Sequence, residues 1–413
     1  MGSSKMAIIV QKFGGSSVAD TEKLFAVCKH ITREFDQGNQ VVVVVSAQGK
    51  TTDGLVKQIG EIAETPSQRE YDVLLSTGEQ ITIAKLAMCL QELGYDAISY
   101  MGWQVPLITD GNHANARIEY IESKNIRADL DNGKIVIVTG FQGVDRQGNI
   151  TTFGRGGSDT TAVALAAALN ADKCEIYTDV DGIFSSDPRI ITNVKKIETM
   201  CSDEMLELAS LGAKVLHSRC VEIGKNYDVP IHVKSTFMEE SCGTLIKNDR
   251  DNFEKLVISG IAKQDNNSRI TVICDKILCE KKDSCQPYKV FKLLADHGVN
   301  VDIIVKSHDG TAETDISFSI ESKELDKTLK VLKKYKQDIG AKKILHSDGL
   351  SKISVVGVGM VNTPGVAAIT FEVLHNSGID MHMISTSEIK ISILVDADKA
   401  NLAMQVLHDQ FMS

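Results

Sequence analysis

Short runs of apolar, mostly β-branched residues alternate with longer amphipathic segments over the first 245 residues of the chain. The short runs have the length of buried strands, and the longer segments carry apolar residues at helical spacing. Five consecutive valines, Val41–Val45, are typical of a strand buried on both faces, as in a parallel sheet covered by helices. The alternation therefore predicts an α/β sandwich with a mostly parallel central sheet. The expected strands are Met6–Val10, Val41–Val45, Ala97–Tyr100, Ile135–Thr139, Lys173–Thr178 and Pro230–Ser235, the last of this unit, and the expected helices are Ala19–Phe35, Leu55–Glu64, Tyr71–Leu93, Ala162–Leu169 and Met205–Leu216.

The loops of this unit also follow a pattern. Glycine-rich loops come directly after the expected strands, whereas a polar stretch rich in Asp, Gly and Asn runs from the strand ending at Tyr100 through Ala116. Ligands of open parallel sheets bind beyond the carboxyl ends of the strands. The glycine-rich loops are therefore expected to converge on one edge of the sheet.

The remainder of the chain repeats itself. The segment His297–Ser307 parallels Ser377–Ser387, 80 residues later. Each copy follows an expected strand and helix and precedes another strand and an amphipathic helix. This βαββαβ order predicts two ferredoxin-like domains in tandem. Such a pair is common in small-molecule sensing, and a dimerisation appendage is the alternative. We expect a catalytic domain at 6–248, repeat domains at 265–338 and 339–413, and a linker at 249–264 able to add a strand to the second repeat.

Composition and charge narrow the class of protein. A chain of 413 residues is too long for one ordinary domain. The net charge of −10, with no basic cluster to offset it, argues against nucleic-acid binding. We expect no membrane span and no signal peptide, because neither an apolar run of sufficient length nor a signal-peptide pattern is present. The nine cysteines lack a Cys-x-x-Cys pair, which favours free thiols in a reducing cytosol. The expected setting is therefore cytoplasmic, without a membrane partner.

The segment Gly154–Thr161 is the strongest candidate for a binding loop. Its three glycines let the backbone approach a ligand closely, and its Ser, Asp and Thr residues are typical of a helix start. A helix that begins here presents free N–H groups suited to an anion, and Arg155 adds a planar fork for a carboxylate or phosphate. The alternative is a structural turn and helix cap with a surface arginine.

A second candidate is the turn Lys12–Ser17, which joins the first expected strand to the first helix. It matches neither the Walker A spacing nor the dinucleotide fingerprint. The turn still offers a helix N-terminus for an anion, with Lys12 as a mobile point charge. A solvated lysine at the strand end is the alternative.

Further polar residues lie after strands or inside helices. Glu79 is either a solvated carboxylate or the partner of a substrate ammonium group, and Gly78 beside it indicates close packing or a ligand. Asp179 could bond a sugar hydroxyl and Arg189 could reach a phosphate, although a polar turn explains both equally well. The hydroxyls of Ser46–Asp53 either bind substrate or cap the following helix.

Five motifs stand in order along the chain: Lys12–Ser17, Ser76–Glu79, Gly154–Thr160, Thr178–Gly182 with Asp187–Arg189, and Gly212–His217. Together they resemble the monofunctional aspartate kinases, which join an amino-acid-kinase domain to two ACT domains. The motifs follow the family's order, and the likeness covers nearly the whole chain. The resemblance implies an amino-acid-kinase three-layer sandwich followed by two ACT domains. It also implies transfer of the ATP γ-phosphoryl group to the side-chain carboxylate of L-aspartate, with Mg²⁺ held mainly by the nucleotide and no metal ligands from protein side chains.

The resemblance also assigns roles to residues. Lys12, Arg155, Asp159 and Lys214 would be catalytic. Aspartate would be held by Thr52, Glu79, Arg155 and Ser158, with Glu79 on the ammonium group and Arg155 on the α-carboxylate. ATP would be bound by Lys12, Gly14, Gly15, Ser16, Thr178, Asp179, Phe184, Arg189 and Lys214.

Regulation is the last implication. The resemblance implies feedback inhibition by lysine, with threonine as a second candidate, and a homodimer or homotetramer assembled through the ACT domains. Asp283 and Asp302 are the candidate effector contacts, and a solvated strand-start aspartate is the alternative for Asp302. The chain departs from the family at Phe184, where tyrosine is usual, and in the loop Cys274–Gln286, which lacks the usual turn of the first ACT domain. The alternative functions are a kinase for glutamate, acetylglutamate, carbamate or UMP, and a non-catalytic amino-acid sensor.

Overall fold

The structure is a computed structural model that describes residues 6–211, 215–238, 242–248, 257–275, 287–307 and 313–412. Two compact units share the chain. The first takes in the described residues of 1–184, 196–210 and 214–253, and the second those of 185–195, 211–213 and 254–413. One short stretch of the first half of the chain thus belongs to the second unit.

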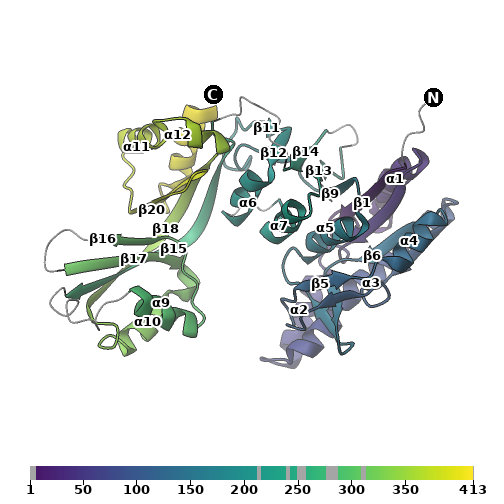
Figure 1. Ribbon diagram of the computed structural model, residues 1–413, viewed down its shortest axis with the longest axis horizontal. Coiled ribbons are helices and arrows are strands. Elements are labelled where there is room, and N and C mark those ends of the chain that lie inside the picture. The colour runs from purple at the N-terminus through teal and green to yellow at the C-terminus, as the bar shows by residue number, and fades with distance from the viewer. Residues whose placement is uncertain are drawn as a thin grey trace. The chain divides into compact units, whose positions relative to one another are not determined.

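An eight-stranded sheet forms the centre of the first unit (Figure 1). Every neighbouring pair is parallel except β13 with β14, so the predicted mostly parallel sheet is confirmed. In sheet order the strands are β12 (Thr199–Cys201), β14 (Thr244–Lys247), β13 (Ile231–Ser235), β9 (Lys173–Thr178), β1 (Ile8–Phe13), β2 (Gln40–Val45), β6 (Ile135–Thr139) and β3 (Ala97–Tyr100). The expectation that β13 ends this unit is wrong, because β14 follows it and adds an antiparallel strand.

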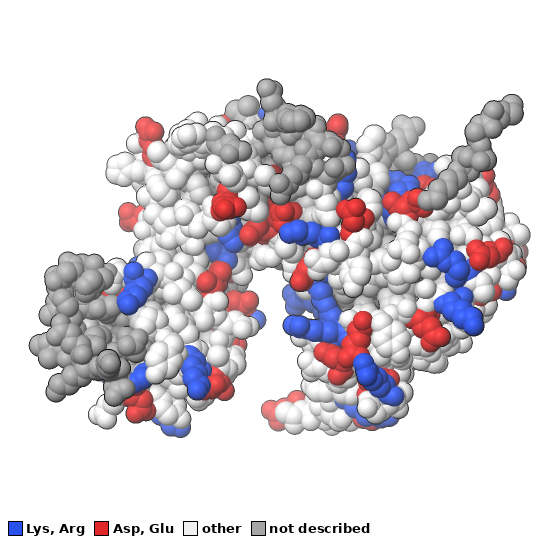
Figure 2. All heavy atoms as spheres, viewed as in Figure 1, with Lys and Arg blue, Asp and Glu red and all other residues white. Residues whose placement is uncertain are grey.

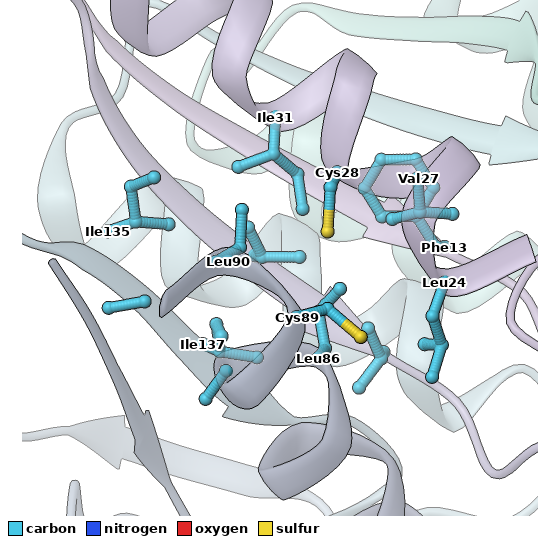
Figure 3. Packing of buried hydrophobic residues seen from close by; sticks show 14 of the residues in the cluster. Phe13, Leu24, Val27, Cys28, Ile31, Leu86, Cys89, Leu90, Ile135 and Ile137 are labelled. Carbon is cyan, nitrogen blue, oxygen red and sulfur yellow. The ribbon is translucent and has the colours of Figure 1, made fainter. Parts of the chain in front are cut away.

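The helices of the first unit cover this sheet. They are α1 (Thr21–Asp36), α2 (Thr51–Ile62), α3 (Gln68–Glu92), α4 (Lys124–Asp131), α5 (Gly157–Leu169), α6 (Ser202–Ser210) and α7 (Ser218–Asn226). Figure 3 shows side chains of α1 and α3 packed together over β6. Val41, Val43 and Val45 of β2 join that cluster, and Val42 and Val44 are equally buried on the other face of the strand. Burial on both faces explains the valine run.

The helix α3 has the length and composition of a membrane span, although no apolar run of that length was expected from the sequence. More than half of its apolar window is buried inside the protein. Asp72 and Glu79 are also buried along it. We interpret α3 as the core helix of a globular unit.

A second, four-stranded sheet in the first unit was not predicted. It runs β5 (Ile118–Ile121), β4 (Leu107–Thr109), β7 (Gln142–Asp145) and β8 (Ile150–Thr152). Strands of three or four residues are too short to show a periodic pattern, which explains why β4 lies within the expected polar stretch. The expected helix Met205–Leu216 also ends earlier, because α6 stops at Ser210.

The second unit is built on one six-stranded sheet. Its order is β16 (Ile304–Ser307), β17 (Glu313–Glu321), β15 (Gly260–Asp275), β18 (Ala341–Val356), β20 (Lys390–Asp396) and β19 (Met383–Thr386). Figure 1 shows two helix pairs on either side of β15 and β18, namely α9 (Pro287–Asp296) with α10 (Leu325–Lys334), and α11 (Val366–Asn376) with α12 (Ala400–Met412). Each pair covers a separate apolar cluster, as expected for two ferredoxin-like domains.

The strands β15 and β18 serve both repeats. Residues 267–275 of β15 pair with β17, whereas residues 260–264 pair with residues 352–356 of β18, which also pair with β20. The two strands cross from one repeat to the other at a bulge, where Asn266 and Gly349 take positive φ angles of 59° and 69°.

Equivalent side chains of the two repeats bond across this crossing. Ser351 donates to Asp265 at 2.8 Å, and Ser268 donates to Asp348 at 2.7 Å. The two repeats are therefore related by an internal two-fold symmetry, and these matched hydrogen bonds join them.

The segment Ser185–Lys195 completes the core of the second unit. Ile191 is fully buried in the cluster beneath α11 and α12. The backbone N–H of Ile261 donates to the carbonyl of Ser185 at 2.8 Å, and the Ser185 hydroxyl lies 2.9 Å from Nε2 of His408. The residues on either side of this segment belong to the first unit, where β10 (Ile183–Phe184) pairs with β11 (Lys196–Ile197).

Surface charge and cysteines complete the description. Figure 2 shows basic and acidic side chains interspersed over the described residues of the face in view. Free thiols occur at Cys28, Cys89, Cys174, Cys201, Cys220 and Cys242. The free-thiol expectation is wrong for Cys274, which is disulfide-bonded. A disulfide depends on the distance and orientation of two cysteines in the fold, so the absence of a Cys-x-x-Cys pair does not exclude it.

Candidate active site

The carboxyl ends of four neighbouring strands, β9, β1, β2 and β6, form the edge that carries the candidate residues. Lys12 is the penultimate residue of β1, and the turn after it closes with a bond from the Ser17 N–H to the Gly14 carbonyl at 2.9 Å. A Cβ on Gly15 would lie 2.7 Å from the carbonyl oxygen of Ala47, which follows β2 closely. Only glycine permits this approach of the two loops.

Lys12 is paired with the glycine-rich segment of α5. Its Nζ lies 2.6 Å from Oδ1 of Asp159, and both side chains are largely buried, with 11% and 13% of their surface exposed. Asp159 occupies the first turn of α5, where a carboxylate is favoured by the helix dipole. The end of β1 and the start of α5, which are far apart in the sequence, therefore meet at one ion pair.

The start of α5 has a backbone that requires its glycines. Gly154 and Gly156 have φ angles of 72° and 69°, and a Cβ on Gly156 would lie 2.4 Å from Cβ of His217. Ser158 is buried against Gly140, and a Cβ on Gly140 would lie 2.6 Å from Oγ of Ser158. The carboxyl end of β6 thus packs against the first turn of α5.

Glu79 is buried at the same edge with half of its carboxylate unsatisfied. Its Oε1 accepts the Ala47 N–H at 2.9 Å, whereas Oε2 has no hydrogen-bond partner among the described residues. Burial raises the pKa of Glu79 to about 7, and the bond from Ala47 offsets only part of the effect. Gly78 permits this approach, because a Cβ there would lie 2.7 Å from that of Ala47. An unpartnered buried carboxylate oxygen is a suitable acceptor for an ammonium group.

The other two aspartate-binding candidates are less constrained. Arg155 is exposed, and it forms no ion pair with any residue that the structure describes. Thr52 is half-buried in the first turn of α2, after the loop that carries Ala47. An exposed arginine beside a fixed loop can reach a bound carboxylate without breaking another contact.

The nucleotide candidates divide between the two units. Thr178 ends β9 and donates to Asp179 at 3.1 Å, and Phe184 is half-buried in β10. Arg189 belongs to the second unit, where it bonds Asp187 through two nitrogens at 2.9 and 2.7 Å. Lys214 lies outside the described residues.

Of the effector candidates, Asp302 is half-exposed and ion-paired with Lys352, whose side chain is almost fully buried. Asp283 lies outside the described residues. A buried lysine is costly without a counter-ion, so Asp302 already has a structural role.

Asp72 is a buried carboxylate that the sequence analysis does not predict. Asp72 accepts from His113 Nδ1 at 2.7 Å and from Thr152 Oγ1 at 2.6 Å, and it bonds the Ala114 N–H at 3.1 Å. A Cβ on Gly154 would lie 3.0 Å from the carbonyl of Ala114. Asp72 therefore stabilises the loop of Ala114, against which Gly154 packs. No local sequence motif indicates this long-range contact.

Glu175 in β9 is another buried carboxylate that was not predicted. It pairs with Lys173 at 2.8 Å and Lys234 at 2.7 Å and accepts from Gln11 at 2.9 Å. Burial opposes ionisation of Glu175, but the lysines outweigh it and lower the pKa to about 2. The network joins β1, β9 and β13 next to Lys12.

Comparison with known proteins gives the same assignment. The amino acid kinase family matches residues 7–235, and an ACT domain family matches residues 287–335 and 353–411. The aspartokinase of Geobacillus stearothermophilus is 49% identical over 406 residues, which cover 98% of this chain and 97% of that protein. The chain belongs to the aspartate kinase family. The predicted family, fold and enzyme class are thereby confirmed.

Solved aspartate kinases extend the likeness to three dimensions. The crystal structure of E. coli aspartokinase III with aspartate and ADP, described as the R-state, has a TM-score of 0.81 and 25% identity, over 98% of this chain and all of that one. The structure of the same enzyme with lysine and aspartate, described as the T-state, has a TM-score of 0.75 at the same identity and coverage. ACT domains in an aspartate kinase indicate allosteric regulation of this chain.

Proposed function

We propose that this aspartate kinase transfers the γ-phosphoryl group of ATP to the side-chain carboxylate of L-aspartate and forms 4-phospho-L-aspartate. The observation that carries the proposal is Oε2 of Glu79, which has no hydrogen-bond partner in the described part of the chain and lies at the sheet edge that also holds the Lys12–Asp159 pair. An amino-acid ammonium group would complete the hydrogen bonding of Glu79. Lys12 would then offer its charge to the phosphoryl group.

The chemistry needs no general base. The side-chain carboxylate of aspartate is ionised at neutral pH, so it can attack phosphorus directly. Catalysis then depends on in-line positioning and on cations around the transferring group. Lys12 and Lys214 would supply the cations, and Asp159 would hold Lys12 in place.

The substrates would be held from several loops. Glu79, Thr52, Ser158 and Arg155 would bind aspartate, with Arg155 on the α-carboxylate. Gly14, Gly15, Ser16, Thr178, Asp179, Phe184, Arg189 and Lys214 would bind ATP. Aspartate and ADP in the E. coli relative support both substrate classes.

Mg²⁺ would travel with the nucleotide. The described residues contain no group of three or more His, Cys, Asp or Glu side chains able to hold a metal ion. The ion would take its oxygen ligands mainly from the phosphates, with water completing the shell. Bound there, it would neutralise phosphate charge.

Regulation is proposed to act through the two ACT domains, at 265–338 and 339–413, on a kinase domain at 6–248. Lysine is the first candidate effector, because the E. coli relative binds it, and threonine is the second. An effector ammonium that reached Asp302 would have to share it with Lys352. We further propose a cytoplasmic homodimer or homotetramer assembled through the ACT domains, without nucleic-acid or membrane partners.

The test is a product assay with two acceptors. Purified protein with ATP and Mg²⁺ receives either aspartate or glutamate, and hydroxylamine traps the acyl phosphate as a hydroxamate. Hydroxamate formation with aspartate alone is expected, and a preference for glutamate contradicts the proposal. Lysine binding by calorimetry without any turnover would support a sensor instead.

A further inference from the structure

Thr236 connects three elements around the candidate nucleotide site, and no motif marks it in the sequence. It lies just after β13 and is 5% exposed. Its hydroxyl lies 2.6 Å from the hydroxyl of Ser17, 219 residues earlier in the chain. Ser17 is fully buried and closes the glycine turn through its bond to Gly14. The side chain of Thr236 therefore holds the turn that follows Lys12.

The backbone of Thr236 holds the two other elements. Its N–H donates to the carbonyl of Thr178 at 2.9 Å, at the carboxyl end of β9. Its carbonyl lies 3.0 Å from Nε2 of His30 in α1. A carbonyl only accepts, so Nε2 of this buried ring carries the proton and Nδ1 is left to accept from Arg33. All three polar groups of Thr236 are thus used.

We propose that Thr236 is a positioning residue for ATP, which sets the spacing between the glycine turn and the end of β9. This inference rests on the proposed function, in which Gly14–Ser16 contact the phosphates and Thr178 contacts the rest of the nucleotide. Thr236 has no direct contact with substrate in this scheme. It acts through Ser17 on one side and Thr178 on the other.

The position calls for a hydroxyl of threonine or serine. Valine has nearly the shape of threonine but would leave the buried Ser17 hydroxyl without its partner, which costs more than the bond contributes. Thr236→Val is therefore expected to raise the KM for ATP about tenfold and to change the KM for aspartate less than about twofold. Thr236→Ser keeps the hydroxyl and should restore the KM for ATP to within about twofold of wild type.

Ser17→Ala gives an independent check of the same contact. Removing both hydroxyls leaves no unpaired group, so the double variant should have a smaller effect on the KM for ATP than the product of the two single effects. Additive single effects would show that the two hydroxyls act separately, which would overturn the proposal.

A second buried hydroxyl pair provides the matched control. Thr151 and Thr109 lie 2.8 Å apart in the four-stranded sheet, and both are almost fully buried. Thr151→Val removes a comparable bond, so it should lower thermal stability to a similar extent while leaving the KM for ATP within about twofold of wild type.

The experiment measures the KM for ATP and for aspartate in wild type and all five variants, with the melting temperature of each. A selective rise in the KM for ATP in Thr236→Val, rescued by serine and absent in Thr151→Val, supports the positioning role. An unchanged KM for ATP, an equal rise for both substrates or the same rise in Thr151→Val overturns it. If wild type itself forms no acyl phosphate from aspartate, the proposed function fails instead, and calorimetry of ADP binding to the same variants then tests Thr236 alone.

Discussion

Lys12 and Asp159 form a largely buried ion pair, 2.6 Å long, between the end of β1 and the first turn of α5. The pair has two consequences. It holds the ammonium group of Lys12 over the glycine turn, since a Cβ on Gly14 would lie 3.5 Å from Nζ. It also gives a largely buried ammonium group the counter-ion that a buried charge requires.

Replacing Lys12 should affect turnover more than binding. Lys12→Met removes the charge that would stabilise the transferring phosphoryl group, so we expect kcat to fall by about 10²–10³ while both KM values change less than about threefold. Steady-state kinetics measures both. Lys23→Met, on the exposed surface of α1, is the control. Wild-type turnover in Lys12→Met would remove this residue from the chemistry.

The raised pKa of Glu79 predicts that the binding of aspartate depends on pH. Its pKa is raised to about 7 in the free enzyme, and only the ionised carboxylate attracts an ammonium group. The kcat/KM for aspartate should therefore rise as pH increases towards about 7 and level off above it. Glu79→Gln should lower the plateau and remove this inflection. A profile of kcat/KM across the range tests both, and an inflection that survives in Glu79→Gln would assign it to another group.

Arg155 should discriminate between the two substrates. If its guanidinium binds the α-carboxylate of aspartate, Arg155→Ala should raise the KM for aspartate by about 10–100-fold, with little change for ATP. Arg146→Ala is a suitable control, because Arg146 is also exposed and pairs only with the surface residue Glu119 in the described part of the chain. Equal effects on the two KM values would contradict the assigned role.

Glu175 should contribute to the stability of the first unit. Glu175→Gln leaves two lysines beside a neutral side chain, so we expect a loss of about 3–5 kcal/mol in the unfolding free energy of the first unit. Because the pKa of Glu175 is lowered from 4.5 to about 2, this contribution is present above pH 4.5 and is lost as pH falls towards 2. Urea unfolding of variant and wild type at several pH values measures the difference.

Two outcomes would weigh against that account of Glu175. One is a difference that stays constant down to pH 2. The other is an equal loss in Glu61→Gln, an exposed position on α2 that serves as the control. Either would show that the buried ion pairs do not carry the stability.

Local pattern was enough to predict the elements whose signal is repeated along the chain. The five valines of β2 indicated burial on both faces, and the parallel between His297–Ser307 and Ser377–Ser387 predicted the second unit. Sequence did not reveal the four-stranded sheet, because β4 and β8 have only three residues each. Periodicity needs more residues than that to be visible.

The same limit applies within the candidate site. Lys12, Glu79 and Asp159 could be named from motifs, but the pairing of Lys12 with Asp159 could not. The bonds of Asp72 to Thr152 and of Ser17 to Thr236 join residues 80 and 219 positions apart, and no local residue pattern encodes such a pairing. Motifs name candidate side chains for a ligand, whereas long-range folding decides which contacts hold these side chains in place.

The shared strands β15 and β18 restrict how this chain can be recombined with its relatives. Since each strand runs through both ACT domains, any chimera that exchanges one of these domains alone must cut two strands in their middle. It must also preserve the matched bonds of Asp265 with Ser351 and of Asp348 with Ser268. Exchange of effector specificity between aspartate kinases is therefore expected to succeed when both domains are transferred as one block.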